Sequence, residues 1–279
     1  MRIKHRFTFH EKEKKIFDFL NKHDIEFDHN NKSWVVVFEV FEDHKEFSTI
    51  KDFMKLYNST GISAAVYTKE EIESAQWLSV YSTWRSLYPH PRDDMGYRHT
   101  TYNGANLCEG NGLHKCDKAL IQKENFVLEK EPNWGPRNFL MINWVGDEFF
   151  ISQKAEAVLR NSQLVGFDIY DVNNKMGNAM QGVKQLFIKN YLDYGMHPDS
   201  IGSAFVCPKC GLESYMMKAG VNHFKREIFE GVEEDIIKTK EKFGEIISYN
   251  LILVTHKFYE VVTKAKLDRG LVFEPIVLI

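Results

Sequence analysis

Cys207-Pro208-Lys209-Cys210-Gly211 is the stretch around which the rest of the chain is organised. Two cysteines separated by two residues, with glycine directly after the second, are typical of a zinc knuckle. The glycine permits the left-handed backbone that turns neighbouring N–H groups toward the sulfur atoms. A structural zinc site takes four ligands, so these two thiolates predict that another segment completes the site.

The other two cysteines, Cys108 and Cys116, lie together in Cys108-Glu-Gly-Asn-Gly-Leu-His-Lys-Cys116. We expect this loop to approach the knuckle, with Cys108 joining Cys207 and Cys210 as the third ligand. Cys116 is the predicted fourth ligand, because thiolate sulfur binds zinc far better than an amide oxygen does. His114 is the alternative fourth ligand. The predicted cofactor is therefore one structural zinc ion.

Composition narrows the class of protein. The formal net charge of −3 gives no basic footprint, which counts against nucleic-acid binding without sequence preference. No apolar run approaches the length of a membrane span, and the first ten residues show no apolar leader. We therefore expect a cytoplasmic protein with reduced thiols, in which paired cysteines bind metal more often than they form disulfides.

The N-terminal part alternates predicted strands and helices in the order β-α-β-β-α-β. This order is typical of ferredoxin-like domains, with an antiparallel sheet and two helices on one face. The predicted domain covers residues 1–78, with strands at 3–9, 25–27, 34–41 and 62–68 and helices at 11–23 and 44–58. The residues expected to be buried are Phe17, Leu20, Val35, Val37, Phe47, Ile50 and Met54.

Residues 79–136 are predicted to form a bridge that carries the first cysteine loop. The bridge contains proline, glycine and asparagine between aromatic residues, which indicates irregular backbone. Residues 70–78, directly before the bridge, have a helical composition.

A weak internal repeat marks residues 137–279. Phe150 to Leu159 resembles Leu253 to Val262, with Ser152 and Thr255 at the position of a helix N-cap. Each copy reads as strand, amphipathic helix, glycine-containing turn and strand. We therefore predict an α/β domain of two related strand-helix-strand units that contains the knuckle as an insertion, and we expect segments 149–172 and 252–276 to superpose.

Several motifs together resemble those of bacterial double-CxxCG motif proteins. They are Cys108-x-x-Asn111-Gly112, Lys130-Glu-Pro-Asn-Trp134-Gly135, the region from Phe139 to Phe150, the knuckle, and the tail from Leu253 to Pro275. The resemblance covers about residues 97–279, and the family pattern has cysteine where this chain has Asn111. Some members of the family are similar to immunity proteins that neutralise a toxin delivered by neighbouring cells. The resemblance therefore implies a cognate protein toxin as partner.

The resulting hypothesis is a binding protein without enzymatic activity. The sequence lacks a phosphate-binding glycine loop, a nucleophile elbow and a zinc-protease helix motif. Two alternatives remain open: a nucleic-acid-binding zinc-knuckle protein that stacks bases on its aromatic residues, and an enzyme that uses Cys207 or Cys108 as nucleophile. The acidic run from Glu227 to Glu245 is interpreted as a solvated helix face, or alternatively as a docking face for a basic partner.

Overall fold

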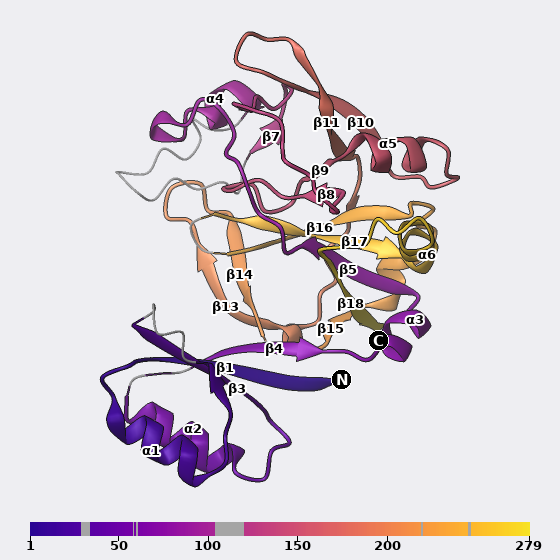
Figure 1. The fold of residues 1–279 in the computed structure, drawn as a ribbon. Helices are drawn as coiled ribbons and strands as arrows, with labels where there is room; N and C mark the ends of the chain where they lie inside the picture. The colour runs from indigo at the N-terminus through magenta and orange to yellow at the C-terminus, as the bar shows by residue number, and fades with distance from the viewer. Residues whose placement is uncertain (29–33, 58, 60, 104–119, 219, 245–246) are drawn as a thin grey trace. The chain divides into compact units, whose positions relative to one another are not determined.

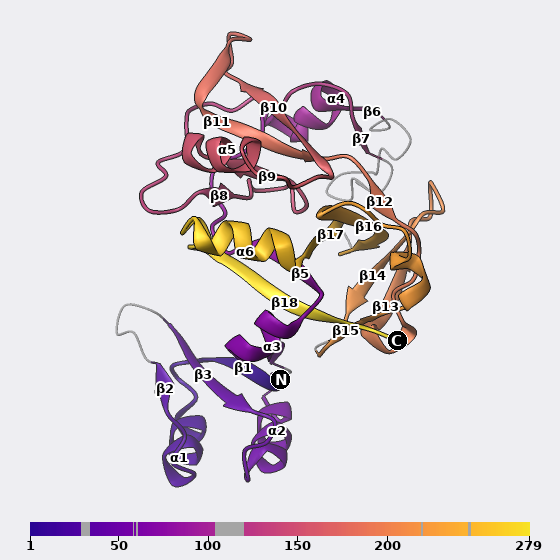
Figure 2. The same ribbon diagram turned by 90° about the vertical axis from the view of Figure 1, so that its right-hand side faces the viewer.

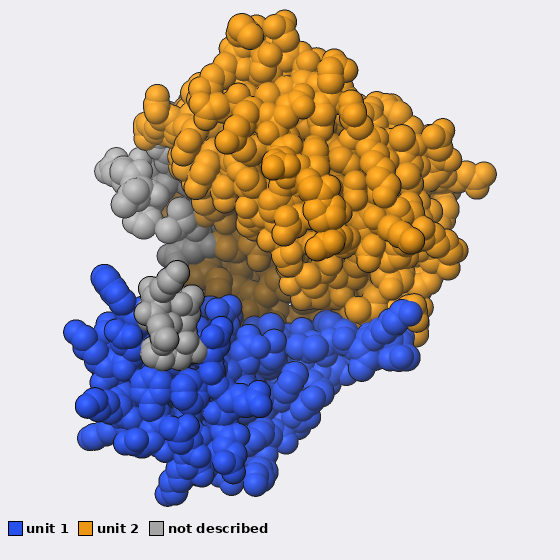
Figure 3. Space-filling view, in the orientation of Figure 1, with its two compact units in different colours: residues 1–71, 219–221 blue, residues 72–218, 222–279 orange. Residues whose placement is uncertain are grey.

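The protein has a mixed α+β fold in which strands predominate. The computed structural model describes residues 1–28, 34–57, 59, 61–103, 120–218, 220–244 and 247–279, and these contain six α-helices. They form two compact units, residues 1–71 with 219–221 and residues 72–218 with 222–279 (Figure 3). The boundary lies within α3 (Lys69–Ser74), and the predicted bridge at 79–136 is part of the second unit. None of the described helices is both long and apolar enough to cross a membrane.

The first unit is an antiparallel sheet with two helices on one face (Figure 1). The strands follow the order β2-β3-β1-β4, and both neighbours of β1 run antiparallel to it. The predicted sequence of strands and helices is present. Its elements are β1 (Arg2–His10), α1 (Lys14–Lys22), β2 (Phe27–Asp28), β3 (Val35–Phe41), α2 (Phe47–Lys55) and β4 (Ile62–Val66).

The expectation that Val35 and Val37 face the core was wrong by one residue. Val36 and Phe38 are buried instead, whereas Val35 is 45% exposed and Val37 is half-buried. Residues 34–38 are all apolar, and within this strand only Glu39, which is exposed, marks the outer face on which Val35 and Val37 also lie. Pairing with β1 decides the register, because it places Phe38 opposite Phe7 on the side that the helices cover.

The helices contribute to this core as the sequence predicts, with one difference of degree. Leu20, Ile50 and Met54 are fully buried, and Phe17 and Phe47 are half-buried at the edge of the same cluster.

The second unit contains two similar sheet modules (Figure 2). Module A is a four-stranded sheet in the order β8-β9-β11-β10, with α5 between β9 and β10. Its elements are β8 (Phe139–Leu140), β9 (Phe149–Ile151), α5 (Gln153–Arg160), β10 (Phe167–Asn173) and β11 (Ala179–Ile188).

Module B is part of a larger sheet and has the order β16-β17-β5-β18, with α6 between β17 and β18. Its elements are β16 (Ile236–Phe243), β17 (Tyr249–Thr255), α6 (His256–Lys264), β18 (Leu271–Leu278) and β5 (Trp77–Ser82). The first part of the predicted bridge is therefore a central strand, β5, which lies antiparallel between β17 and β18.

The two modules agree in register as well as in strand order. In module A, Phe150 pairs with Leu140 on one side and with Gln185 on the other. In module B, Leu253 pairs with Ile237 on one side and with Ser79 on the other. We call residues at matching register positions counterparts. The counterpart ranges are 139–141 and 236–238, 146–152 and 249–255, 167–170 and 271–274, and 184–191 and 78–85.

The helix N-termini match in detail. The Ser152 hydroxyl accepts the N–H of Ala155, as the Thr255 hydroxyl accepts that of Phe258. Each hydroxyl also donates a 2.8 Å hydrogen bond to the residue that precedes the first strand of its module, Asn138 in one case and Asp235 in the other. Each predicted repeat segment thus contains its helix, and each cap residue is where the sequence predicts it.

Two inserts occupy corresponding places in the chain. One joins β5 to β8 and the other joins β11 to β16, so each insert leads from a central strand of one module to the hairpin of the other. The first contains η1 (Asp93–Met95), α4 (Tyr97–Thr101), β6 (Tyr102–Asn103) and β7 (Ile121–Gln122). The second contains β12 (Tyr191–Leu192), η3 (Pro198–Ser200), β13 (Ile201–Val206), β14 (Glu213–Met217), β15 (Asn222–Phe224) and η4 (Arg226–Phe229).

The acidic run from Glu227 is not the helix that the sequence suggested. The run begins in η4, passes through a loop and enters β16, where Ile236 and Ile237 are both buried. A strand can bury consecutive residues when both of its faces are covered, which explains why this apolar pair does not follow helical spacing.

Candidate functional site

The knuckle is the turn of the hairpin formed by β13 and β14. The last pair of the hairpin is Val206 with Glu213, and the N–H of Cys207 donates to the carbonyl of Leu212 at 3.0 Å. The N–H of Gly211 donates to the carbonyl of Cys207 at 2.9 Å, and Gly211 has φ of 70°. The glycine therefore provides the left-handed backbone that the motif requires.

The structure describes half of the predicted zinc site. Cys207 is buried and Cys210 is half-buried, and both are on the knuckle turn. The predicted third and fourth ligands, Cys108 and Cys116, lie outside the described residues, as does the alternative ligand His114. Within the described ranges, no three His, Cys, Asp or Glu residues gather closely enough to hold a metal ion. The convergence of the two cysteine loops stays a prediction.

A surface groove of about 320 Å³ lies beside the knuckle turn. Tyr194 is 68% exposed and Leu212 is 43% exposed. The Tyr215 hydroxyl donates to a Glu213 carboxylate oxygen at 2.7 Å, which raises the pKa of Tyr215 to about 12. We call this feature the knuckle groove; its lining residues are Tyr194, Gly211, Leu212, Glu213, Tyr215, Lys240 and Lys242.

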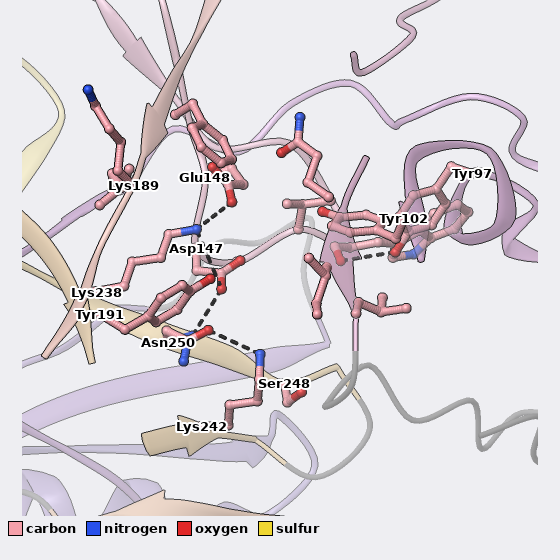
Figure 4. A pocket seen from close by; sticks show the side chains of 18 residues that line it. Tyr97, Tyr102, Asp147, Glu148, Lys189, Tyr191, Lys238, Lys242, Ser248 and Asn250 are labelled. Carbon is pink, nitrogen blue, oxygen red and sulfur yellow. Dashed lines mark hydrogen bonds and ion pairs between the residues drawn. The ribbon is translucent and has the colours of Figure 1, made fainter. Parts of the chain in front are cut away.

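A second cavity, of about 200 Å³, lies between the first strand of module B and the loop that precedes β9 (Figure 4). Its wall combines charged, amide and hydroxyl groups with the rings of several aromatic residues. We call it the polar cavity; the residues that carry its chemistry are Asp147, Glu148, Lys189, Tyr191, Lys238, Lys242, Ser248 and Asn250.

A buried ion pair forms one side of the polar cavity. The Lys238 ammonium contacts Glu148 Oε1, and the two side chains are 3% and 6% exposed. Gln185, which is fully buried, donates to Glu148 Oε2 at 3.0 Å. A carboxylate of Asp147 lies 3.9 Å from the same ammonium. Removing two charges from water can cost more free energy than their mutual attraction returns, so a pair buried this deeply need not stabilise the fold.

The pair shifts the titration of both partners. Burial raises the pKa of Glu148, and the neighbouring Asp147 carboxylate raises it further against the opposing effect of Lys238. Burial alone would lower the pKa of Lys238, but the two carboxylates outweigh it and raise this pKa above its ordinary value. Lys238 therefore carries a full positive charge inside the protein.

The opposite wall is built by β17 and the residue before it. The Asn250 N–H donates to Asp147 Oδ2 at 3.2 Å, and Lys242 donates to Asn250 Oδ1 at 3.0 Å. The Ser248 hydroxyl is buried at the same wall and makes no hydrogen bond within the described structure.

Sequence reasoning did not find the polar cavity. Its two charged partners are distant in the chain, and the run that holds Lys238 was interpreted as a solvated acidic face. One local signal was available: Lys238 follows Ile236 and Ile237 within a strand, where a charged side chain is uncommon unless it has a partner.

Neither a protein-family model nor a curated protein sequence matches this chain significantly. The resemblance to double-CxxCG proteins accordingly remains a prediction.

Proposed function

We propose that this protein is a binding protein without enzymatic activity, which holds another protein at the knuckle groove. The observation that carries the proposal is the exposure of Tyr194 and Leu212 beside a hydrogen-bonded turn. Tyrosine is enriched at protein–protein interfaces, and the exposed ring of Tyr194 next to Leu212 offers apolar contact area beside a hydrogen-bonded turn. A bacterial toxin is the partner that the family resemblance implies.

The state of Cys207 supports the same proposal over a cysteine-dependent enzyme. Its side chain is only 9% exposed. Reactive cysteines are usually accessible to their substrates, whereas buried cysteines are usually structural or bind metal.

The proposal includes a structural zinc ion at the knuckle. Cys207 and Cys210 on one tight turn fit two corners of a tetrahedral site, and Cys108 and Cys116 are the proposed remaining ligands. A zinc ion there would fasten the two inserts together and contribute to folding.

Two assignments of fold complete the proposal. The strand order β2-β3-β1-β4 with two helices on one face supports a ferredoxin-like first unit. The matched register and matched helix caps support a tandem duplication in the second unit. In this duplication β5 begins the copy that contains β8, β9 and β10 but lies in the sheet of module B, and β11 begins the copy that contains β16, β17 and β18 but lies in the sheet of module A.

The experiment begins with the metal content of protein purified without chelator. About one zinc per chain is expected, and Cys207→Ser and Cys210→Ser should each lose it and lower the unfolding temperature. Protein without zinc, and with unchanged stability in both variants, would contradict the structural zinc.

The binding test uses a toxin domain encoded beside the gene, produced with this protein and titrated by calorimetry. Leu212→Asp and Tyr194→Ala should weaken binding by at least about tenfold, because a charge or a truncation at the centre of an interface removes desolvated contacts. Met176→Asp is the matched control, because Met176 is 81% exposed at the tip of the β10–β11 hairpin. Equal effects from all three variants would overturn the assignment of the groove.

A further inference from the structure

The strands of the second unit belong to two similar segments of the chain that exchange one strand. We call residues 77–173, from β5 to β10, the first copy and residues 179–278, from β11 to β18, the second copy. β5 of the first copy lies in the sheet of module B, and β11 of the second copy lies in the sheet of module A. Each module therefore contains strands of both copies, as in a dimer whose subunits have swapped a strand.

A pseudo-two-fold axis passes between the two copies. Asp147 and Asn250 are counterparts, and the N–H of Asn250 donates to Asp147 Oδ2 at 3.2 Å. Gly146 and Tyr249 are also counterparts, and a Cβ atom added at Gly146 would lie 3.0 Å from Tyr249 Cβ. A residue that meets its own counterpart lies beside a two-fold axis, because the axis exchanges the two positions. Contacts on one side of this axis can therefore be compared with their equivalents on the other side.

Lys238 and Met141 occupy the same place on the two sides of the axis. They hold matching register positions in β16 and β8. The N–H of Lys238 donates to Asn190 at 3.1 Å, and the N–H of Met141 donates to Trp84 at 3.2 Å. In each case the residue after the acceptor pairs in parallel with the donor. The backbone around the lysine is thus repeated around the methionine.

The polar contacts of Glu148 cross from one copy to the other (Figure 4). Glu148 and Asp147 belong to the first copy, and Lys238 and Gln185 belong to the second copy. The Lys238 ammonium contacts Glu148 Oε1, and Gln185 donates to Glu148 Oε2 at 3.0 Å. One copy therefore supplies the acid, and the other copy supplies its cation and its amide donor.

The equivalent contact on the other side of the axis is apolar. Glu148 corresponds to Leu251 and Lys238 to Met141, and both apolar side chains line a cavity of about 240 Å³. The fold therefore does not require charges at these positions, and replacing a buried ion pair by apolar residues is often neutral or stabilising. The best-attested role of a buried polar pair is to select one way of pairing among several.

Pairing between like copies would leave these charges without partners. Where two first copies meet, each Glu148 would face Met141, and two Asp147 carboxylates would meet at the axis. Where two second copies meet, each Lys238 ammonium would face Leu251. A buried charge without a partner is strongly destabilising, and like charges brought together add to the cost. Each charge has its partner when a first copy pairs with a second copy.

We propose that the polar cluster of Asp147, Glu148, Gln185 and Lys238 selects the pairing of unlike copies and excludes the pairing of like copies from two chains. A chain built of two similar copies presents the same backbone surfaces to a second chain, which opens a route to swapped assemblies. The cluster makes that route costly at a site where apolar residues would serve the fold of one chain equally well. The proposal rests on the duplication proposed above and is independent of the zinc ion and of the knuckle groove.

The test reverses one charge in each of two chains. Glu148→Lys and Lys238→Glu each place like charges between the copies of one chain. When the two variants are unfolded and refolded together, exchange of second copies through the connection at residues 174–178 restores both ion pairs. We therefore expect a mixed dimer by native mass spectrometry, which unfolds at least about 5 °C above either variant alone.

An ion pair within one copy is the matched control. Asp235 and Lys257 both belong to the second copy, and Lys257 Nζ lies 2.9 Å from Asp235 Oδ2. Asp235→Lys and Lys257→Glu should gain nothing from refolding together, because exchange of copies does not bring opposite charges together at this place. An equal gain from both pairs of variants, or no mixed dimer from the first pair, would overturn the proposal.

Two single-chain variants decide the question if the reversed charges prevent folding. Glu148→Lys/Lys238→Glu restores an ion pair within the chain and should recover at least about half of the fall in unfolding temperature of the single variants. Glu148→Leu/Lys238→Met should fold, and after refolding at about 100 μM it should contain at least about threefold more dimer than the wild type. No recovery in the first variant, or no more dimer in the second than in the wild type, would contradict the proposed role.

Discussion

Modules A and B have the same backbone arrangement but differ in the cavities that lie between each module and the inserts. Strand order, pairing register, helix caps and the hydrogen bonds around Lys238 and Met141 agree between them. The side chains at the matched positions differ: an ion pair faces one cavity, and Met141 and Leu251 face the other. Features common to both modules can be attributed to the requirements of the fold. A buried ion pair that is present at only one of the two cavities is not required by the fold.

The largest expected effect comes from breaking the ion pair on one side. Glu148→Leu leaves the Lys238 ammonium buried without its partner, which should destabilise the protein by about 3–5 kcal/mol. Lys238→Met should cost less, because the raised pKa of Glu148 lets this carboxyl group take up a proton and become neutral. Urea unfolding at neutral pH measures both free energies.

The double variant is the control for this comparison. Glu148→Leu/Lys238→Met should recover most of the loss and come within about 1 kcal/mol of the wild type, because it reproduces the apolar residues at the matching positions of module B and module A, Leu251 and Met141. If the losses of unfolding free energy in the two single variants simply add in the double variant, the two side chains do not act as a pair. The match between the two cavities would then not predict stability.

A smaller effect on stability is expected from substituting two glycines, Gly166 directly before β10 in module A and Gly270 directly before β18 in module B. Gly166 and Gly270 have φ of 106° and 90°, so alanine is strained at either position. At Gly166 a methyl group would also collide with the carbonyl of Ile236 and lie 2.9 Å from Glu234 Cβ, whereas at Gly270 the nearest atom, in Arg137, is 3.7 Å away. Gly166→Ala should therefore cost about 1–3 kcal/mol more than Gly270→Ala in thermal or urea unfolding. Equal costs would mean that the loop at Gly166 moves away from β16 freely.

Local patterns predicted the parts of the fold that depend on neighbouring residues. The helix caps at Ser152 and Thr255 follow from short-range chemistry, and the order of elements in the first unit follows from the spacing of apolar residues. The role of β5 did not follow, because its place between β17 and β18 depends on partners more than 160 residues later in the chain. The register of β3 was also missed, because residues 34–38 show no alternation and the single outward-facing polar residue, Glu39, comes late in the strand.

The same distinction applies to the sites. The turn at Cys207–Gly211 was predictable because two cysteines and a glycine specify it within five residues. The polar cavity joins Glu148 to Lys238 across the unit, and the comparison of the two modules shows that this pair is unusual. A charged residue in a strand has many structural explanations. Lys238 has fewer, because the residue at the matching position of the other module is Met141.

The smallest expected effect concerns another polar pair that only one module has. In module B the Tyr81 hydroxyl lies 3.5 Å from a Glu274 carboxylate oxygen, whereas their counterparts in module A, Phe187 and Tyr170, are two stacked rings. Burial raises the pKa of Tyr81 to about 12, and the charge and hydrogen bond of Glu274 add to the shift.

This shift predicts a loss of stability at high pH. Because the pKa of Tyr81 is about 12 in the folded protein and 10.0 ordinarily, the unfolded chain releases this proton first. The contribution to stability is complete below the ordinary pKa and disappears as the pH rises through the folded value. Tyr81→Phe, which installs the module A residue, should reduce the fall in unfolding free energy between about pH 9 and about pH 11. Phe187→Tyr is not a matched reverse change, because Phe187 stacks on Tyr170. Glu274→Gln is the better control. It should bring the pKa of Tyr81 only part of the way back to the ordinary value, because burial is the larger cause of the shift. An identical pH slope in the wild type and Tyr81→Phe would show that this pair does not distinguish the modules.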